Sequence, residues 1–84
     1  MDWSNEAKEL LSNMLLVIPA QYKELAKNGV ISTAEKIAGE AHLEQVTQDA
    51  VARGFLKSTP KEFLPLTIDS LEAFGVSLAD LQIV

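Results

Sequence analysis

Apolar side chains recur every three or four residues near the start of the chain, which predicts an amphipathic helix. They are Ala7, Leu10, Leu11, Met14 and Leu15. Ser4 is a suitable N-cap for this helix, and Trp3 before it predicts a hydrophobic staple over the first turns. Pro19 ends the helix at or before Ile18, because the residue before a proline avoids the α region.

Pro19 also fits the first position of a second helix. The Asn28-Gly29 pair is a typical helix stop, and Ser32 with Glu35 forms a capping box that starts a new helix. The apolar period nevertheless continues through this stretch, at Val30, Ala34, Ile37, Ala38 and Ala41. We expect two helical pieces that meet near Gly29. One continuous helix, from Pro19 to about the last of these apolar positions, is the alternative.

A third helix is predicted over residues 48–53. Thr47 is its N-cap, and Gly54 supplies a C-terminal stop. Val46 stands before the cap and Val51 stands four residues after it, which is the spacing of a second hydrophobic staple.

The last part of the chain carries three more start signals. Residues 59–62 read Thr-Pro-Lys-Glu, a helix start that Pro65 limits to little more than one turn. Thr67 is then expected to cap a helix over residues 68–74 that ends at Gly75. A final turn is expected over residues 77–81.

These signals predict an all-α fold, a small compact bundle of short helices that forms a single domain over residues 1–84. Strand-like alternation is nowhere sustained. Short helices are not stable alone, so we expect residues 55–84 to pack as extra helices on residues 2–54.

Composition excludes several classes of function. The chain has no cysteine, which removes disulfides, thiolate zinc sites and iron–sulfur ligands. Its formal charge is −5 and its only arginine is Arg53, which argues against nucleic-acid binding. The longest apolar run, residues 14–18, is far shorter than the roughly 20 residues that span a bilayer. We expect a cytoplasmic protein without a membrane span and without a cofactor.

The order of the helix signals resembles a known small domain over roughly residues 2–54. The matching positions are Trp3, Ser4, Glu6, Ala7, Leu10, Pro19, Glu35, Ala38, Val46, Thr47 and residues 50–52. This pattern is similar to the PCP_red domain, a C-terminal domain of light-independent protochlorophyllide reductase. The resemblance implies a stand-alone accessory domain connected with chlorophyll biosynthesis and photosynthesis. The family has a glycine where this chain has His42, and the stretch after Gly54 has no counterpart in it.

His42 is the only histidine and lies between Glu40 and Glu44. Side chains two residues apart on a helix point in different directions, so a metal site is not expected. We expect His42 to have a role at a helix end or in a turn. A single axial ligand to a tetrapyrrole metal is the alternative role for His42.

Two carboxylate pairs suggest acid–base chemistry, Glu6 with Glu35 and Glu44 with Asp49. Such pairs need a desolvated pocket to act as acid and base, whereas capping and solvation explain all four residues. The sequence therefore predicts no catalytic residue.

Two hypotheses for function remain. The first is a non-catalytic interaction module that docks on a larger protein through an apolar face with acidic rims. This partner-binding surface is predicted at Met14, Ile18, Tyr22 and Leu25, within and after the apolar run of residues 14–18. The second is a small protein that binds a tetrapyrrole or similar flat apolar ligand, with Trp3, Tyr22 and the phenylalanines around it.

Overall fold

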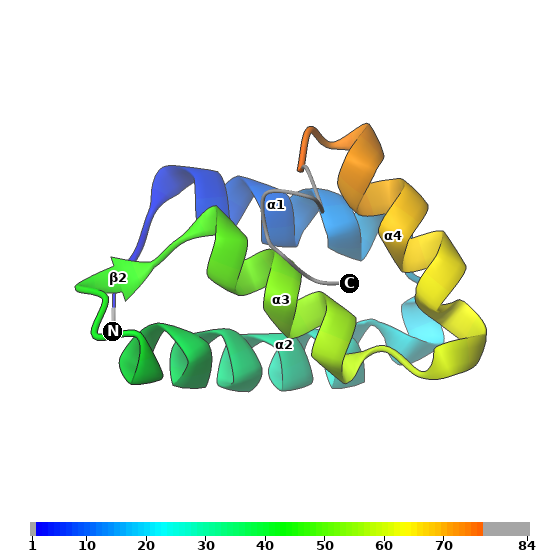
Figure 1. Ribbon diagram of the computed structural model, residues 1–84. Helices are drawn as coiled ribbons and strands as arrows, with labels where there is room; N and C mark the ends of the chain where they lie inside the picture. Colours follow the sequence, from blue (N-terminus) through cyan, green and yellow to red (C-terminus); the bar gives the residue numbers. More distant parts are fainter. Residues whose placement is uncertain (1, 77–84) are drawn as a thin grey trace.

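The computed structural model describes residues 2–76 and confirms the all-α expectation. Within these residues four α-helices form a small bundle beside a two-residue strand pair (Figure 1). The elements are β1 (Asp2–Trp3), α1 (Asn5–Leu16), α2 (Ala20–Glu40), β2 (Gln45–Val46), α3 (Gln48–Ser58), the 3₁₀ turn η1 (Lys61–Phe63) and α4 (Leu64–Ala73). The final turn expected over residues 77–81 lies outside the described residues.

Helices α1 and α3 start side by side and in the same way. Ser4 Oγ accepts a hydrogen bond of 3.1 Å from the N–H of Ala7, and Thr47 Oγ1 accepts one of 3.2 Å from the N–H of Ala50, which confirms both predicted caps. Each cap directly follows one strand of a parallel ladder in which Trp3 pairs with Val46. The two helices therefore leave the ladder in the same direction.

Helix α2 runs without a break from Ala20 to Glu40, so the break expected near Gly29 is wrong. Its three buried residues, Val30, Ala34 and Ala38, form one face directly after the stop signal and pack in the core. Packing of this face outweighs the local signal, because tertiary contacts decide most helical stability. The side chain of Glu35 does not cap a new helix and instead accepts a hydrogen bond from Trp3.

Gly54 does not end α3, which continues to Ser58. A Cβ at this glycine would lie 3.2 Å from the carbonyl oxygen of Val30 and 3.3 Å from the amide nitrogen of Ala34. The glycine thus permits a close approach of α3 to the backbone of α2, which is a packing role and not a stop signal. One turn of α3 after Gly54, the Oγ of Ser58 lies 3.3 Å from the Oγ1 of Thr33 in α2.

Helix α4 begins at Leu64, four residues before the predicted start at Ile68. The helix predicted to start at residues 59–62 is the single 3₁₀ turn η1, which ends before Pro65. Pro65 itself lies in the first turn of α4, where a missing N–H costs no hydrogen bond, so this proline is compatible with the start of α4. Thr67 is consequently inside the helix, and its hydroxyl donates to Thr59 Oγ1 at 3.4 Å.

Helices α2 and α4 end in the same hydrogen-bond pattern, the Schellman motif. In α4 the N–H of Val76 donates to the oxygen of Leu71 at 2.9 Å, and Gly75 has φ +89°, which confirms the predicted stop at this glycine. In α2 the N–H of Leu43 donates to the oxygen of Ala38 at 2.9 Å, and the left-handed position is taken by His42, with φ +59°. His42 therefore has a helix-end role, at a position that favours glycine.

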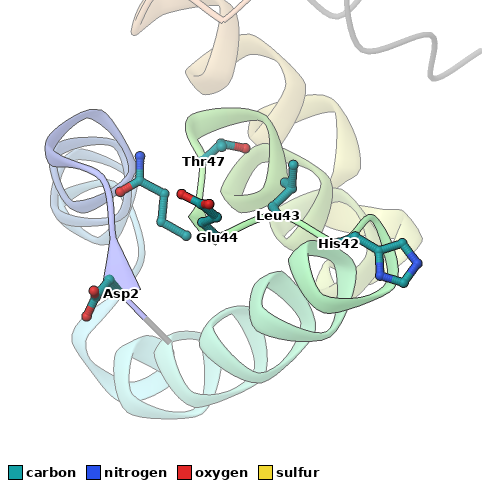
Figure 2. A pocket seen from close by; sticks show the side chains of 6 residues that line it. Asp2, His42, Leu43, Glu44 and Thr47 are labelled. Atoms are coloured by element: carbon teal, nitrogen blue, oxygen red, sulfur yellow. The ribbon is translucent and has the colours of Figure 1, made fainter.

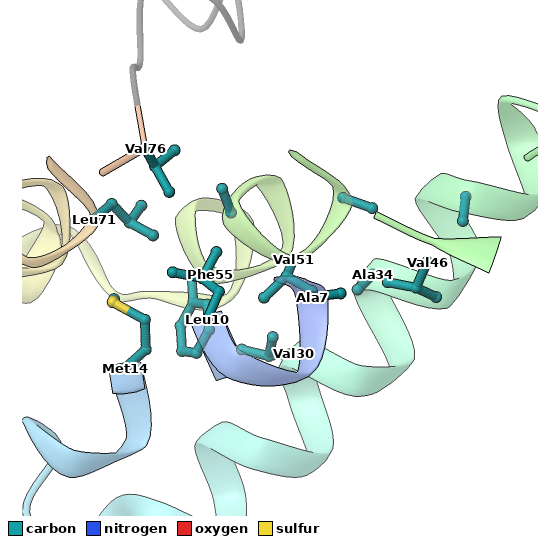
Figure 3. Packing of buried hydrophobic residues seen from close by; sticks show 13 residues of the cluster. Ala7, Leu10, Met14, Val30, Ala34, Val46, Val51, Phe55, Leu71 and Val76 are labelled. Carbon is teal, nitrogen blue, oxygen red and sulfur yellow. The ribbon is translucent and has the colours of Figure 1, made fainter. Parts of the chain in front are cut away.

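The core lies between α1, α2 and α3 and is closed by the end of α4 (Figure 3). Small side chains make up much of it, which suits closely packed short helices. Trp3 is partly buried and packs against the same cluster. The buried apolar residues are Ala7, Leu10, Met14, Val30, Ala34, Ala38, Val46, Ala50, Val51, Ala52, Phe55, Leu71 and Val76.

The topology gives the bundle two different ends. At the ladder end, residues 2–9 and 35–49 bring together the strands, the starts of α1 and α3 and the end of α2. Because α2 returns beside α3 in the opposite direction, its start meets the ends of α1 and α3 at the other end (Figure 1). We call this second region, residues 16–28 and 57–66, the open end.

Candidate functional site

The structure separates the four residues predicted to bind a partner. Met14 is 2% exposed, and Figure 3 shows its side chain among the core residues. Ile18 is half-buried and packs against the core. Tyr22 and Leu25, on the first two turns of α2, are 49% and 76% exposed. Only the latter two side chains are largely accessible to a partner.

Most of the large exposed apolar side chains in residues 2–76 belong to the open end. Six lie there, and the seventh, Leu43, lies at the ladder end. The six residues are Leu16, Val17, Tyr22, Leu25, Phe63 and Leu66. Leu16 and Val17 belong to the apolar run that the sequence singled out. Phe63 and Leu66 are not distinguished from core residues by the sequence, because their positions alone do not show that the α3–α4 connection passes over this end.

The open end is exposed because α2 is longer than the helix that covers it. Helix α3 ends at Ser58, whose side chain lies beside Gly29 of α2. The turns of α2 before Gly29 extend past this point, and no residue between Ala20 and Gly29 is buried. This overhang presents Tyr22 and Leu25 with a spacing of three residues, a typical spacing of anchors on a helix surface.

Charges are distributed unequally between the two ends. The open end has four basic residues and two acidic ones, a formal charge of +2. The ladder end has seven acidic residues and two basic ones, a formal charge of −5. The open-end residues are Lys23, Lys27, Lys57, Lys61, Glu24 and Glu62. The acidic rims expected around the apolar face do not agree with this composition, because the open end has more lysines than glutamates.

A polar surface hollow lies at the ladder end (Figure 2). It has a volume of about 520 Å³ and is lined by Asp2, His42, Leu43, Glu44, Gln45 and Thr47. Figure 2 shows the imidazole of His42 directed away from Asp2 and Glu44. The hollow is open and its lining residues are exposed or half-buried, so it offers neither the dry walls nor the converging groups of a catalytic pocket.

The carboxylates considered for acid–base chemistry have separate structural settings. Glu35 is bonded to the indole of Trp3, and Asp49 is exposed in the first turn of α3, where the helix dipole favours an acid. Glu6 has the corresponding place in α1. Among residues 2–76 no group of three or more histidine, aspartate or glutamate side chains is arranged to hold a metal ion.

The fold and these surfaces define a small all-α bundle with one exposed apolar end. No helix within residues 2–76 combines the length and the hydropathy needed to cross a bilayer. The sequence matches the family described as "Protein of unknown function (DUF2621)" over residues 1–82, and the chain belongs to this family. Neither the solved structures nor the curated proteins include a significant match to the chain.

The resemblance to the PCP_red domain is therefore wrong. The family match extends through the stretch after Gly54, for which the PCP_red pattern has no counterpart. The matching signals were short and mostly local: Ser4 and Thr47 are helix caps, and Glu35 binds Trp3. Helix caps recur in unrelated helical proteins, because any helix must satisfy its first N–H groups. The connection with protochlorophyllide reductase, chlorophyll biosynthesis and photosynthesis is withdrawn with the resemblance.

Proposed function

We propose that this protein is a non-catalytic interaction module that docks on a larger protein through its open end. The observation that supports the proposal is the concentration of exposed large apolar side chains there, six of the seven in the described residues. Large exposed apolar patches are typical of protein interaction sites. Aromatic anchors such as Tyr22 and Phe63 are enriched among the residues that carry binding energy.

The proposal places the protein in the cytoplasm and its partner among proteins and not nucleic acids. A net charge of −5 and a single arginine do not supply the phosphate contacts that nucleic-acid binding requires. The ligand-binding alternative, for a tetrapyrrole or similar flat apolar ligand, stays a prediction. The polar hollow at the ladder end does not favour it, since such a ligand needs apolar walls.

Site-specific photo-crosslinking tests the docking role. The photoreactive residue p-benzoylphenylalanine replaces Leu25 in one variant and Leu43 in a matched control, since Leu43 is an exposed leucine at the opposite end. In cells of the source organism, we expect position 25 to form a discrete adduct with a larger protein and position 43 to form none. Adding Tyr22→Asp should abolish the adduct. Equal adducts from both positions, or none from position 25, would contradict the proposal.

A further inference from the structure

The first turns of α2 form a helix with little tertiary support. Residues 20–28, the overhang of α2, include no buried side chain, and only Lys23 and Ala26 among them are half-buried. Val30, at 1% exposure, is the first residue of α2 that is buried in the core. Unwinding of α2 from its start to Gly29 would therefore bring no buried side chain of this helix into solvent.

The start of α2 also lacks the local signals that begin the two neighbouring helices. Helix α1 begins with the cap of Ser4 and has Glu6 in its first turn. Helix α3 begins with the cap of Thr47 and has Asp49 in its first turn. At the start of α2, Pro19 forms no side-chain cap, and the first turn has no acidic residue. Because a cap and an acid in the first turn each stabilise a helix start, the first turn of α2 forms less readily.

The overhang ends at residues that weaken a helix. Asn28 and Gly29 both have low helix propensities, and a glycine in a helix interior lowers helix formation about fivefold relative to alanine. This pair lies where α2 leaves its contact with α3, because the side chain of Ser58, the last residue of α3, is beside Gly29. The local stop signal and the loss of tertiary packing therefore coincide at the same residues.

We infer that the overhang exchanges between a helical and an unwound form, and that docking through the open end selects the helical form. The second part of this inference rests on the proposed docking role. Tyr22 and Leu25 are three residues apart, so they share one side of the chain while the segment is helical. A partner that contacts both residues binds the helical form more tightly and shifts the population towards it. The fraction of helical molecules then scales the apparent affinity for the partner.

Amide hydrogen exchange of the full-length protein, followed by NMR, tests the unwinding. We expect residues 24–28 to have protection factors at least about tenfold lower than residues 31–38 of the same helix, because the overhang opens without global unfolding. Both ranges lie inside α2, so the comparison separates local opening of the overhang from the stability of the whole fold.

Two glycine variants make this measurement specific. Gly29→Ala should slow exchange at residues 24–28 about fivefold, because alanine favours the helix and a Cβ at this position lies no closer than 3.9 Å to the side chain of Ser58. Gly39→Ala is the matched control at the other end of α2, where nothing lies within 4 Å of a Cβ. It should leave exchange at residues 24–28 unchanged.

Photo-crosslinking from position 25 tests the selection of the helical form. Lys27 is exposed in the overhang, so Lys27→Ala and Lys27→Gly remove the same charge and differ mainly in helix propensity. We expect Lys27→Gly to give less adduct than Lys27→Ala, by up to about fivefold. Lys36 is an exposed lysine in the packed part of α2, and Lys36→Gly should give as much adduct as Lys36→Ala.

Several outcomes overturn the inference. Equal protection of residues 24–28 and 31–38 would show that the overhang does not unwind separately. Equal slowing of exchange at residues 24–28 by Gly29→Ala and Gly39→Ala would show that these amides open only with the whole fold. Equal adducts from Lys27→Gly and Lys27→Ala would show that docking does not select the helix, although the docking role stands. If position 25 forms no adduct even without these substitutions, the docking role itself fails, and the exchange measurement still decides whether the overhang unwinds.

Discussion

The indole Nε1–H of Trp3 donates a hydrogen bond of 3.1 Å to Oε2 of Glu35, across 32 residues of the sequence. The bond is partly buried and joins β1 to the C-terminal part of α2. Trp3 is also paired with Val46 in the ladder, directly before α3. This one residue therefore connects the start of the chain to α2 through Glu35 and to the start of α3 through Val46. Together the hydrogen bond and the ladder hold the start of the chain against the ladder end of the bundle.

Glu35→Ala is expected to lower the free energy of unfolding by about 1–2 kcal/mol, because hydrogen bonds to charged groups contribute about that much and the indole N–H would lose its partner. Glu40→Ala is the matched control, since Glu40 is an exposed glutamate on the same helix. Urea denaturation of both variants measures the difference. Equal midpoints for the two would show that the bond does not stabilise the fold.

Gly54→Ala should destabilise the protein by about 1–3 kcal/mol, although alanine is normally the better helix former. The added methyl group would meet backbone atoms of Val30 and Ala34 at 3.2 and 3.3 Å, and these atoms move only if the two helices separate. Gly39→Ala provides the control, because nothing lies within 4 Å of a Cβ at that position in α2. We expect Gly39→Ala to stabilise the protein by up to about 1 kcal/mol. Thermal unfolding that ranks these variants in the opposite order would contradict the close helix contact.

His42→Gly should raise the free energy of unfolding by about 0.5–1 kcal/mol, because His42 is exposed and holds a left-handed backbone conformation with φ +59°. Gly75→Ala, at the same position of the motif that ends α4, should lower it by about 1 kcal/mol. Denaturant titrations give both values. Destabilisation by His42→Gly would mean that the imidazole contributes an interaction beyond its backbone role.

Met14→Ala is expected to cost about 2–4 kcal/mol, since Met14 is 2% exposed and its truncation leaves a cavity. Leu25→Ala should change stability by less than about 0.5 kcal/mol, because Leu25 is 76% exposed. Chemical denaturation of the pair separates the core member of the predicted site from its accessible member. A comparable loss of stability in both variants would contradict this assignment.

Local signals in the sequence predict much of the fold. The caps at Ser4 and Thr47 and the stop at Gly75 act through hydrogen bonds within a few residues, so they can be predicted without tertiary structure. Gly29 and Gly54 look similar in the sequence, yet both lie inside helices. Their role depends on the contact between α2 and α3, which only the folded chain brings about.

The candidate site was predictable only in part. Tyr22 and Leu25 stand out as apolar residues after a helix break, but Met14 has the same chemistry and is buried. The lysines of the open end do not form a run in the sequence, because Lys23 and Lys57 belong to different helices whose antiparallel arrangement brings the start of α2 and the end of α3 to the same end of the bundle. The net charge of −5 does not describe the open end, because it averages the two ends of the bundle.

The size of the native complex tests the central claim most directly. The tagged protein, Leu25→Asp and the matched control Leu43→Asp are expressed in the source organism, and each extract is resolved by size-exclusion chromatography. We expect wild type and Leu43→Asp to elute in a complex much larger than the 9.2 kDa chain, and Leu25→Asp to elute near the monomer with an unchanged circular dichroism spectrum. Elution of all three at the same position would contradict docking through the open end.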